Sequence, residues 1–192
     1  MARWLPGARE RLVVAAVDLF TEQGYDATTV AQIAERAGVT RSTFFRHFSD
    51  KREVLVTGQA TLSRLLAEGI ADAPPSASPL EAVAAGLERA SSEMRPVNRE
   101  LGSRLKAAVA ASTELQERDA LKSVGLAAAM TAALVARSVP DPTAHLAAEM
   151  GVLAFKRGYA QWSEGDRDDE TGLAHHALAA LSDLHAATAS LG

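Results

Sequence analysis

The sequence contains no cysteine among its 192 residues, which excludes disulfide bonds, thiolate metal ligands and cysteine nucleophiles. It also lacks an uninterrupted run of about 20 apolar residues, the length that a membrane span needs. The first residues, MARWLPGARER, lack the apolar core of a signal peptide. We therefore expect a soluble, cytoplasmic protein with no membrane partner.

Strand patterns and catalytic motifs are scarce as well. No convincing period-2 alternation or Asn-Gly hairpin interrupts the alanine-rich sequence, so we predict an all-α fold. There is no Gly-rich phosphate loop, Gly-x-Ser-x-Gly elbow or His-Glu-x-x-His motif. A carboxylate-bridged metal enzyme would need Glu-x-x-His pairs on two helices, and the sequence has none. We expect no catalytic residues, metal site or cofactor.

The net charge of −4 argues against a nucleic-acid partner until its distribution is considered. Residues 1–60 hold eight Lys or Arg against seven Asp or Glu, whereas residues 61–192 hold twelve against seventeen. Residues 36–52 hold five basic side chains against Asp50 alone. A solvated helix face would show the same pattern, so the charge needs a motif beside it.

Capping and stop signals divide the N-terminal part into short helices. A helix over residues 8–23 is predicted to end at Gly24, and Thr29 with Gln32 fits a capping box that opens a helix to Ala37. Later helices are separated by proline-rich breaks at residues 72–79 and 139–142, with Asp141 as the cap after the second break. These later helices are predicted over residues 40–48, 51–71, 79–95, 97–111, 113–138, 142–163 and 170–189.

Gly38 stands where a helix-turn-helix needs a residue with positive φ, because two helices that cross at about 90–120° require a tight turn. Ala34, which is small, and Phe44 have the spacing that packs the two helices together. The helix after the turn is predicted to face Phe44 and Phe48 inward. Its outward side chains are Arg41, Ser42, Thr43, Phe45 and Arg46, which suit base edges and phosphates.

The segment AAVDLFTEQGYDATTVAQIAERAGVTRSTFFRHFSDKREVL, residues 15–55, closely resembles the DNA-binding domain of the TetR family of transcriptional regulators. The series LF, GY, TTV, IA, AGV, HF and K occurs in order and at the family's spacing. In that family the third helix enters the major groove. The resemblance implies DNA-contacting positions at Arg41, Ser42, Thr43, Phe45, Arg46 and His47, with Thr29 and Lys51 as phosphate contacts.

Two of these positions depart from the simple expectation. Phe45 stands where the family often has tyrosine, so a phosphate hydrogen bond must be lost or replaced by van der Waals contact. His47 can also be interpreted as a core histidine that bonds a backbone carbonyl.

An alternative function for the whole protein is an adaptor whose helix-turn-helix no longer binds DNA. The salt dependence of DNA binding distinguishes such an adaptor from a regulator.

The resemblance also implies a homodimer that binds a palindromic operator and is released by an unidentified small molecule, repression being the commoner mode. TetR-like proteins dimerise through their last two helices, here about 142–163 and 170–189, and Leu173, Ala177, Ala180, Leu181 and Leu184 form an apolar stripe that fits either an interface or an ordinary core. The candidate ligand-binding residues are Met94, Leu101, Arg104, Leu105, Met130, Leu134, Met150 and Phe155. Arg104 inside the cavity would suggest an anionic ligand.

We therefore predict about nine helices in two domains. Residues 1–50 are expected to form the three-helix DNA-binding domain, and residues 51–192 the ligand-binding and dimerisation domain. The helix 51–71 is expected to connect the two.

Overall fold

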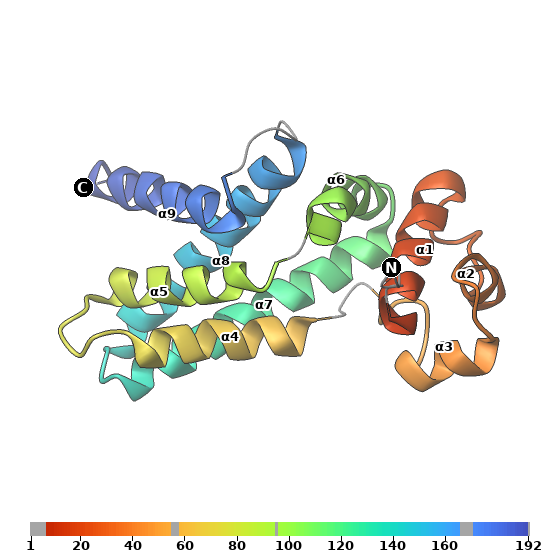
Figure 1. The fold of residues 1–192 in the computed structure, drawn as a ribbon. Helices are drawn as coiled ribbons and strands as arrows, with labels where there is room; N and C mark the ends of the chain where they lie inside the picture. The colour runs from red at the N-terminus through yellow and green to blue at the C-terminus, as the bar shows by residue number, and fades with distance from the viewer. Residues whose placement is uncertain (1–6, 55–57, 95, 166–170, 192) are drawn as a thin grey trace, which may run out of the picture. The chain divides into compact units, whose positions relative to one another are not determined.

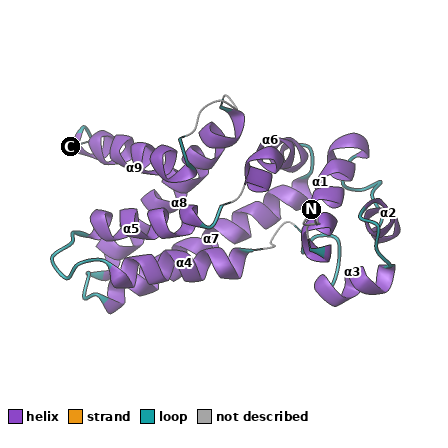
Figure 2. Ribbon diagram, viewed as in Figure 1, coloured by secondary structure: helices purple, strands orange, loops and turns teal. Residues whose placement is uncertain are grey.

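The computed structural model describes residues 7–54, 58–94, 96–165 and 171–191, and every regular element within these ranges is a helix (Figure 1). Figure 2 shows the same helices joined by loops. The prediction of an all-α fold is confirmed. The helices are α1 (Ala8–Gln23), α2 (Val30–Arg36), α3 (Arg41–His47), α4 (Gln59–Asp72), α5 (Pro79–Ser92), α6 (Pro96–Ala110), α7 (Thr113–Ala136), α8 (Asp141–Glu164) and α9 (Leu173–Ala189).

Contacts divide the chain into two compact units. The first unit comprises residues 1–57 and 103–120, and the second comprises residues 58–102 and 121–192. Helices α6 and α7 each contribute residues to both units. The sequence analysis predicted a single domain boundary after residue 50 instead. The DNA-binding function of residues 1–50 and the ligand-binding and dimerisation function of residues 51–192 stay predictions.

The first unit is built on a small core that α1, α2 and α3 share. Leu12, Ile33 and Phe44, one from each helix, are completely buried there. Ala108 and Leu115, from the far part of the chain, belong to the same core. Because burial of a leucine side chain contributes about 1.5–3 kcal/mol, Leu115 is a substantial part of what stabilises this unit.

Local capping signals of the first unit are confirmed. Gly24 ends α1 with φ of 85°, and Gly38 has φ of 66° in the turn between α2 and α3. Thr29 and Gln32 form the predicted capping box at the start of α2. The Thr40 side chain accepts a hydrogen bond from the backbone N–H of Thr43 and caps α3.

Predicted helix starts at residues 51, 97, 142 and 170 differ from the structure, by one to eight residues. The helix predicted to begin at residue 51 begins at Gln59, after Gly58 in the left-handed region with φ of 84°. Residues 51–54 form a turn instead, because the Asp50 carboxylate accepts hydrogen bonds from the backbone N–H groups of Arg52 and Glu53. Helix α8 begins at Asp141 itself, which shifts the predicted cap by one residue.

The second unit has a larger apolar core, to which α4, α5, α7, α8 and α9 contribute. Helices α4 and α5 form a hairpin in which glycines allow the backbones to approach closely (Figure 1). A Cβ atom added at Gly69 would lie 2.6 Å from the carbonyl oxygen of Ala85, and one at Gly86 would lie 2.8 Å from that of Leu66. Gly158 of α8 similarly approaches the backbone of Ala177 on α9.

The apolar stripe predicted on α9 lies in this core. Leu173, Ala177, Ala180 and Leu181 are buried against the rest of the unit, and Leu184 packs at its edge. Helix α9 contacts α8 and α5. The stripe therefore serves packing within the chain, which is the second of the two readings left open by its periodicity.

Among the described residues, α7 is the single helix that has the length and composition to cross a membrane. A core helix of a soluble protein meets the same criterion, so the length and composition of α7 are weak evidence for a membrane span.

Candidate nucleic-acid interface

Helix α3 is held on the first unit by its aromatic side chains. Phe44 is completely buried and Phe48 is nearly so, with their ring centroids 5.4 Å apart. The turn before the helix closes with a hydrogen bond of 2.9 Å from the backbone N–H of Val39 to the carbonyl of Ala34. With one side fixed in this way, the opposite side of α3 faces solvent.

The solvent side of α3 is basic. Arg41, Ser42 and Arg46 are exposed, and none has a hydrogen bond or ion pair in the part of the chain that the structure describes. The exposed fraction of Phe45 is 51%, unusually high for so large an apolar side chain. Thr43 is half-buried, and its hydroxyl lies 3.0 Å from that of Thr40. The predicted outward set thus lies together on one helix face, except that Thr43 is partly occupied by the cap.

His47 lies at the edge of this face. Its ring is half-buried near Phe48, and its Nε2 atom is buried without a hydrogen-bond partner. The alternative in which a backbone carbonyl satisfies that nitrogen is therefore not what the structure has. The predicted DNA contact of His47 stays a prediction.

Thr29 and Lys51, the two predicted phosphate contacts, differ in availability. Thr29 is exposed, although its hydroxyl caps α2 and bonds Gln32 at 2.9 Å. Lys51 is half-buried, and its ammonium donates to the backbone carbonyls of Tyr25 and Thr28 at 2.7 Å and 3.0 Å. Its charge is directed to the loop before α2.

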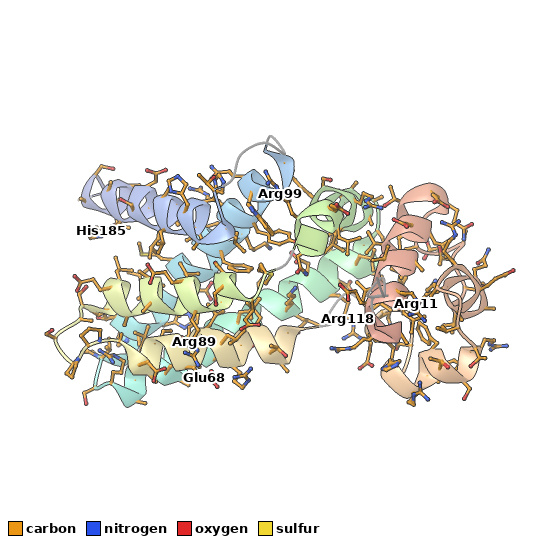
Figure 3. The ribbon with its side chains drawn as sticks, in the orientation of Figure 1. Arg11, Glu68, Arg89, Arg99, Arg118 and His185 are labelled. Carbon is orange, nitrogen blue, oxygen red and sulfur yellow. The ribbon has the colours of Figure 1, made fainter. Side chains whose placement is uncertain are left out.

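Arg11 is a structural contributor that sequence reasoning missed. From α1 (Figure 3) its Nε donates a hydrogen bond of 3.0 Å to the carbonyl of Ala37, at the C-terminal end of α2. A cation at that end also complements the helix dipole. Arg11 thereby stabilises the turn that contains Gly38. No local sequence signal indicates it, because the two residues lie 26 positions apart.

The candidate ligand-binding residues fall in different places. Met130, Leu134, Met150 and Phe155 belong to the core of the second unit, and Met94 packs against that core. Leu101, also in the second unit, is buried. Arg104 and Leu105 belong to the first unit. The eight residues therefore do not form one group.

Arg104 forms an ion pair with Asp18 of α1. The backbone carbonyl of Arg104 is also 3.5 Å from the hydroxyl of Thr21. Its guanidinium thus has a partner within the first unit. An Arg104 side chain inside a ligand cavity, which would have suggested an anionic ligand, is therefore not seen in the described structure.

Two polar atoms in the second unit were not anticipated from the sequence. The hydroxyls of Ser91 on α5 and Thr131 on α7 are buried without hydrogen-bond partners. A buried hydroxyl without a partner costs free energy, so each of these two side chains destabilises the second unit slightly. Tyr159 differs, because its hydroxyl donates a 2.6 Å hydrogen bond to the carbonyl of Asn98. Burial raises the pKa of Tyr159 to about 12.

The fold and this surface define a class of protein: a small helical core presents a short basic helix after a tight glycine turn, as helix-turn-helix DNA-binding proteins do. The sequence profile of bacterial regulatory proteins of the tetR family matches residues 12–56.

Known proteins agree with this class. The transcriptional regulator TcmR of Streptomyces glaucescens is 40% identical over 81 residues, which cover 42% of this chain and 36% of TcmR. SrpR of Pseudomonas putida is 47% identical over 47 residues, which cover 24% of this chain and 22% of SrpR. The chain thus aligns with about a third or less of the length of these relatives. The similarity to TetR-family transcriptional regulators is therefore a similarity of the N-terminal segment, residues 12–56.

Solved structures extend the similarity in fold beyond the N-terminal segment. A transcriptional regulator from Aquifex aeolicus superposes with a TM-score of 0.56 at 20% identity, covering 93% of this chain and 98% of that one. FadR from Bacillus subtilis, solved in complex with stearoyl-CoA, has a TM-score of 0.58 at 19% identity, covering 91% and 96%. At these identities the similarity concerns the fold alone.

Proposed function

We propose that the chain is a ligand-responsive transcriptional repressor that binds a palindromic operator as a homodimer and is released by a small molecule. The observation that carries the proposal is the pair Arg41 and Arg46, exposed and without partners in the described structure, on the helix that follows Gly38. A charged side chain that has no partner in the free protein gives up no internal ion pair when it binds a phosphate or a base.

The proposed DNA surface consists of the solvent face of α3 and the start of α2. Arginine makes bidentate hydrogen bonds to guanine, which suits Arg41 and Arg46 to base recognition. Ser42 can donate to bases or phosphates, and Thr29 can do so once its hydroxyl leaves Gln32. Phe45 lacks the hydroxyl of tyrosine, so its exposed ring is expected to contact sugar or a thymine methyl group.

Dimerisation is proposed to involve α8 and α9. On α8, Leu146 and Leu153 are exposed to 59% and 42%, and their separation of seven residues places them on one face. Exposed leucines at this spacing are typical of a surface that a second helix covers. On α9, Ala179 and Ala186 share the same seven-residue spacing and are exposed, which would permit close packing. Two recognition helices, one from each subunit, would then contact successive major grooves.

The proposed effector is a largely apolar small molecule in the second unit. Core residues such as Met130 and Met150 are flexible enough to rearrange around a guest molecule. The hydroxyls of Ser91 and Thr131 would then gain partners on the ligand. To release DNA, the ligand must bind the low-affinity conformation better by as much as it weakens the DNA complex. A cytoplasmic location follows from a function on the chromosome.

The experiment is selection of a binding duplex from a random DNA pool by the purified full chain, followed by titration of the selected duplex at several salt concentrations. We expect an enriched palindrome, and an affinity that falls steeply with salt because bound phosphates release counterions. Failure to enrich any sequence, with only weak binding to all duplexes, would favour an adaptor that does not bind DNA.

A further inference from the structure

The ammonium of Lys51 is enclosed by the loop before α2. Its Nζ donates hydrogen bonds to the backbone carbonyls of Tyr25 at 2.7 Å and Thr28 at 3.0 Å, with that of Asp26 at 3.5 Å. Nζ also lies 4.0 Å from the centroid of the Tyr25 ring. A lysine ammonium has three N–H donors, and three carbonyls surround this one. The charge therefore already has a full set of partners within the protein.

The ring that Lys51 contacts is itself fixed. Tyr25 is 4% exposed and packs edge-on against Phe20, with centroids 5.1 Å apart. Its hydroxyl donates a hydrogen bond of 3.1 Å to Glu114, at the start of α7. Burial and this hydrogen bond both raise the pKa of Tyr25, so the ring stays neutral and its face stays attractive to a cation. Lys51 thus rests on a rigid support.

The carbonyls that Lys51 binds lie in the loop directly before α2. Thr28 immediately precedes Thr29, the N-cap of α2, and the Thr28 side chain is anchored to the carbonyl of Gly24 at 2.7 Å. Helix α2 passes directly through the Gly38 turn into α3. A shift of the loop 25–28 would therefore change the direction in which α3 is presented.

We propose that Lys51, supported by Tyr25, is a positioning residue that fixes the start of α2 and so the orientation of α3, instead of a phosphate contact. The proposal rests on the proposed function, in which α3 contacts DNA. It replaces the phosphate contact expected of this position from the sequence. It also extends the DNA-binding machinery to Tyr25, a residue that need never touch the duplex.

The two roles predict different DNA-binding behaviour. A lysine that neutralises a phosphate weakens binding about uniformly across sequences when it is removed, and it lowers the slope of log affinity against log salt by about one. A lysine that orients the recognition helix weakens the selected duplex more than unrelated duplexes, and it leaves the salt slope unchanged. The ratio of specific to nonspecific affinity and the slope thus separate the roles.

The first experiment measures amine acylation in the wild-type protein by mass spectrometry, with and without the duplex selected above. In the free protein we expect Lys51 to react about tenfold more slowly than the exposed Lys106 or Lys156, because its amine must first leave the carbonyls. We expect no further protection of Lys51 by DNA. Fast reaction in the free protein with protection on binding would overturn the proposal.

The second experiment compares salt titrations of Lys51→Met, Lys51→Arg and Tyr25→Leu on the selected duplex and on a scrambled one. We expect each variant to lose about tenfold in specific affinity, with the wild-type slope. Lys51→Arg keeps the charge but cannot direct three donors at these carbonyls, so wild-type affinity in this variant would contradict the proposal. Arg46→Ala removes an exposed cation of α3 and shows how the loss of a direct DNA contact appears in the same assay. Circular dichroism excludes unfolded variants.

These outcomes are distinguishable from failure of the proposed function. If the wild-type protein selects no duplex, the proposed function fails, while the acylation of Lys51 in the free protein still tests whether its amine is enclosed. If the wild-type protein binds and the slope falls in Lys51→Met, the positioning role fails alone.

Discussion

Tyr25 and Glu114 lie 89 positions apart in the sequence, yet the Tyr25 hydroxyl donates a hydrogen bond of 3.1 Å to the Glu114 carboxylate. A second link of this kind joins Arg104 to Asp18. Both links attach residues 103–120 to the N-terminal part of the first unit, one at α1 and the other at the loop before α2. A segment from the middle of the chain is therefore structurally part of the helix-turn-helix unit. These polar links and the burial of Leu115 together hold the segment in place.

Arg46→Ala is expected to reduce affinity for the selected duplex by about fivefold to 150-fold, which corresponds to about 1–3 kcal/mol for a lost base contact. Dimerisation and thermal stability should be nearly unchanged, because Arg46 is exposed and has no partner in the described structure. Electrophoretic mobility shift measures the effect. Arg36→Ala is the matched control, since Arg36 is also exposed but pairs with Glu22 on α1. Equal binding by Arg46→Ala and wild type would remove Arg46 from the interface.

Gly38→Ala is expected to destabilise the first unit by about 1–2 kcal/mol, the cost of placing an L-residue in the left-handed region. The cause would be the backbone alone, because a Cβ added at Gly38 meets no atom within 4 Å. Gly172→Ala is the control, since its Cβ also has open space but its φ is −77°. Thermal unfolding followed by circular dichroism compares the two, and equal midpoints would contradict the argument.

Replacement of both Leu146 and Leu153 by serine is expected to weaken the homodimer without unfolding the chain. An apolar leucine covered by a partner is worth about 2 kcal/mol, so the dissociation constant should rise by well over tenfold. Analytical ultracentrifugation provides the measurement. The control replaces Leu121 and Val124 of α7, which are exposed to 61% and 63% but lie outside the proposed interface. An unchanged dimer in the α8 variant, or a dissociated one in the α7 variant, would refute the assignment.

Tyr159 is expected to make the protein sensitive to high pH. Its pKa is about 12 in the folded chain against 10.0 for an unperturbed tyrosine, so the folded state retains a proton that the unfolded state loses. Stability should therefore be fully present below pH 10 and decline as pH rises toward 12. Tyr159→Phe should lose about 1 kcal/mol at neutral pH, because the Asn98 carbonyl loses its donor. It should also decline less steeply above pH 10. Urea denaturation at a series of pH values tests this, and parallel declines would contradict it.

The sequence predicted features that depend on neighbouring residues. The capping box of Thr29, the cap at Thr40 and the positive φ of Gly38 each involve groups within a few positions, so residue type and spacing determine them. The inward placement of Phe44 and Phe48 follows from helical periodicity in the same way. These features position the solvent face of α3, which is why that face could be anticipated.

Features that depend on tertiary packing could not be predicted in this way. Helical periodicity predicts that the apolar stripe of α9 is buried, but it does not predict which helix covers the stripe. In the structure, α8 and α5 of the same chain cover it. Arg104 was likewise a candidate ligand-binding residue, whereas its guanidinium pairs with Asp18, which lies 86 positions away. The expected reach of Lys51 toward a phosphate depended on its position at a helix start, but a turn occupies residues 51–54.

The placement of Ala108 and Leu115 in the first core limits how this protein can be divided or recombined. A fragment that stops at residue 57 would omit both side chains and leave the apolar surface beneath Leu115 open to water. A chimera intended to transplant the proposed DNA-binding surface onto another protein would need two separate stretches of sequence, residues 1–57 and 103–120, grafted together. Exchange of the N-terminal stretch alone would join surfaces that evolved against different partners.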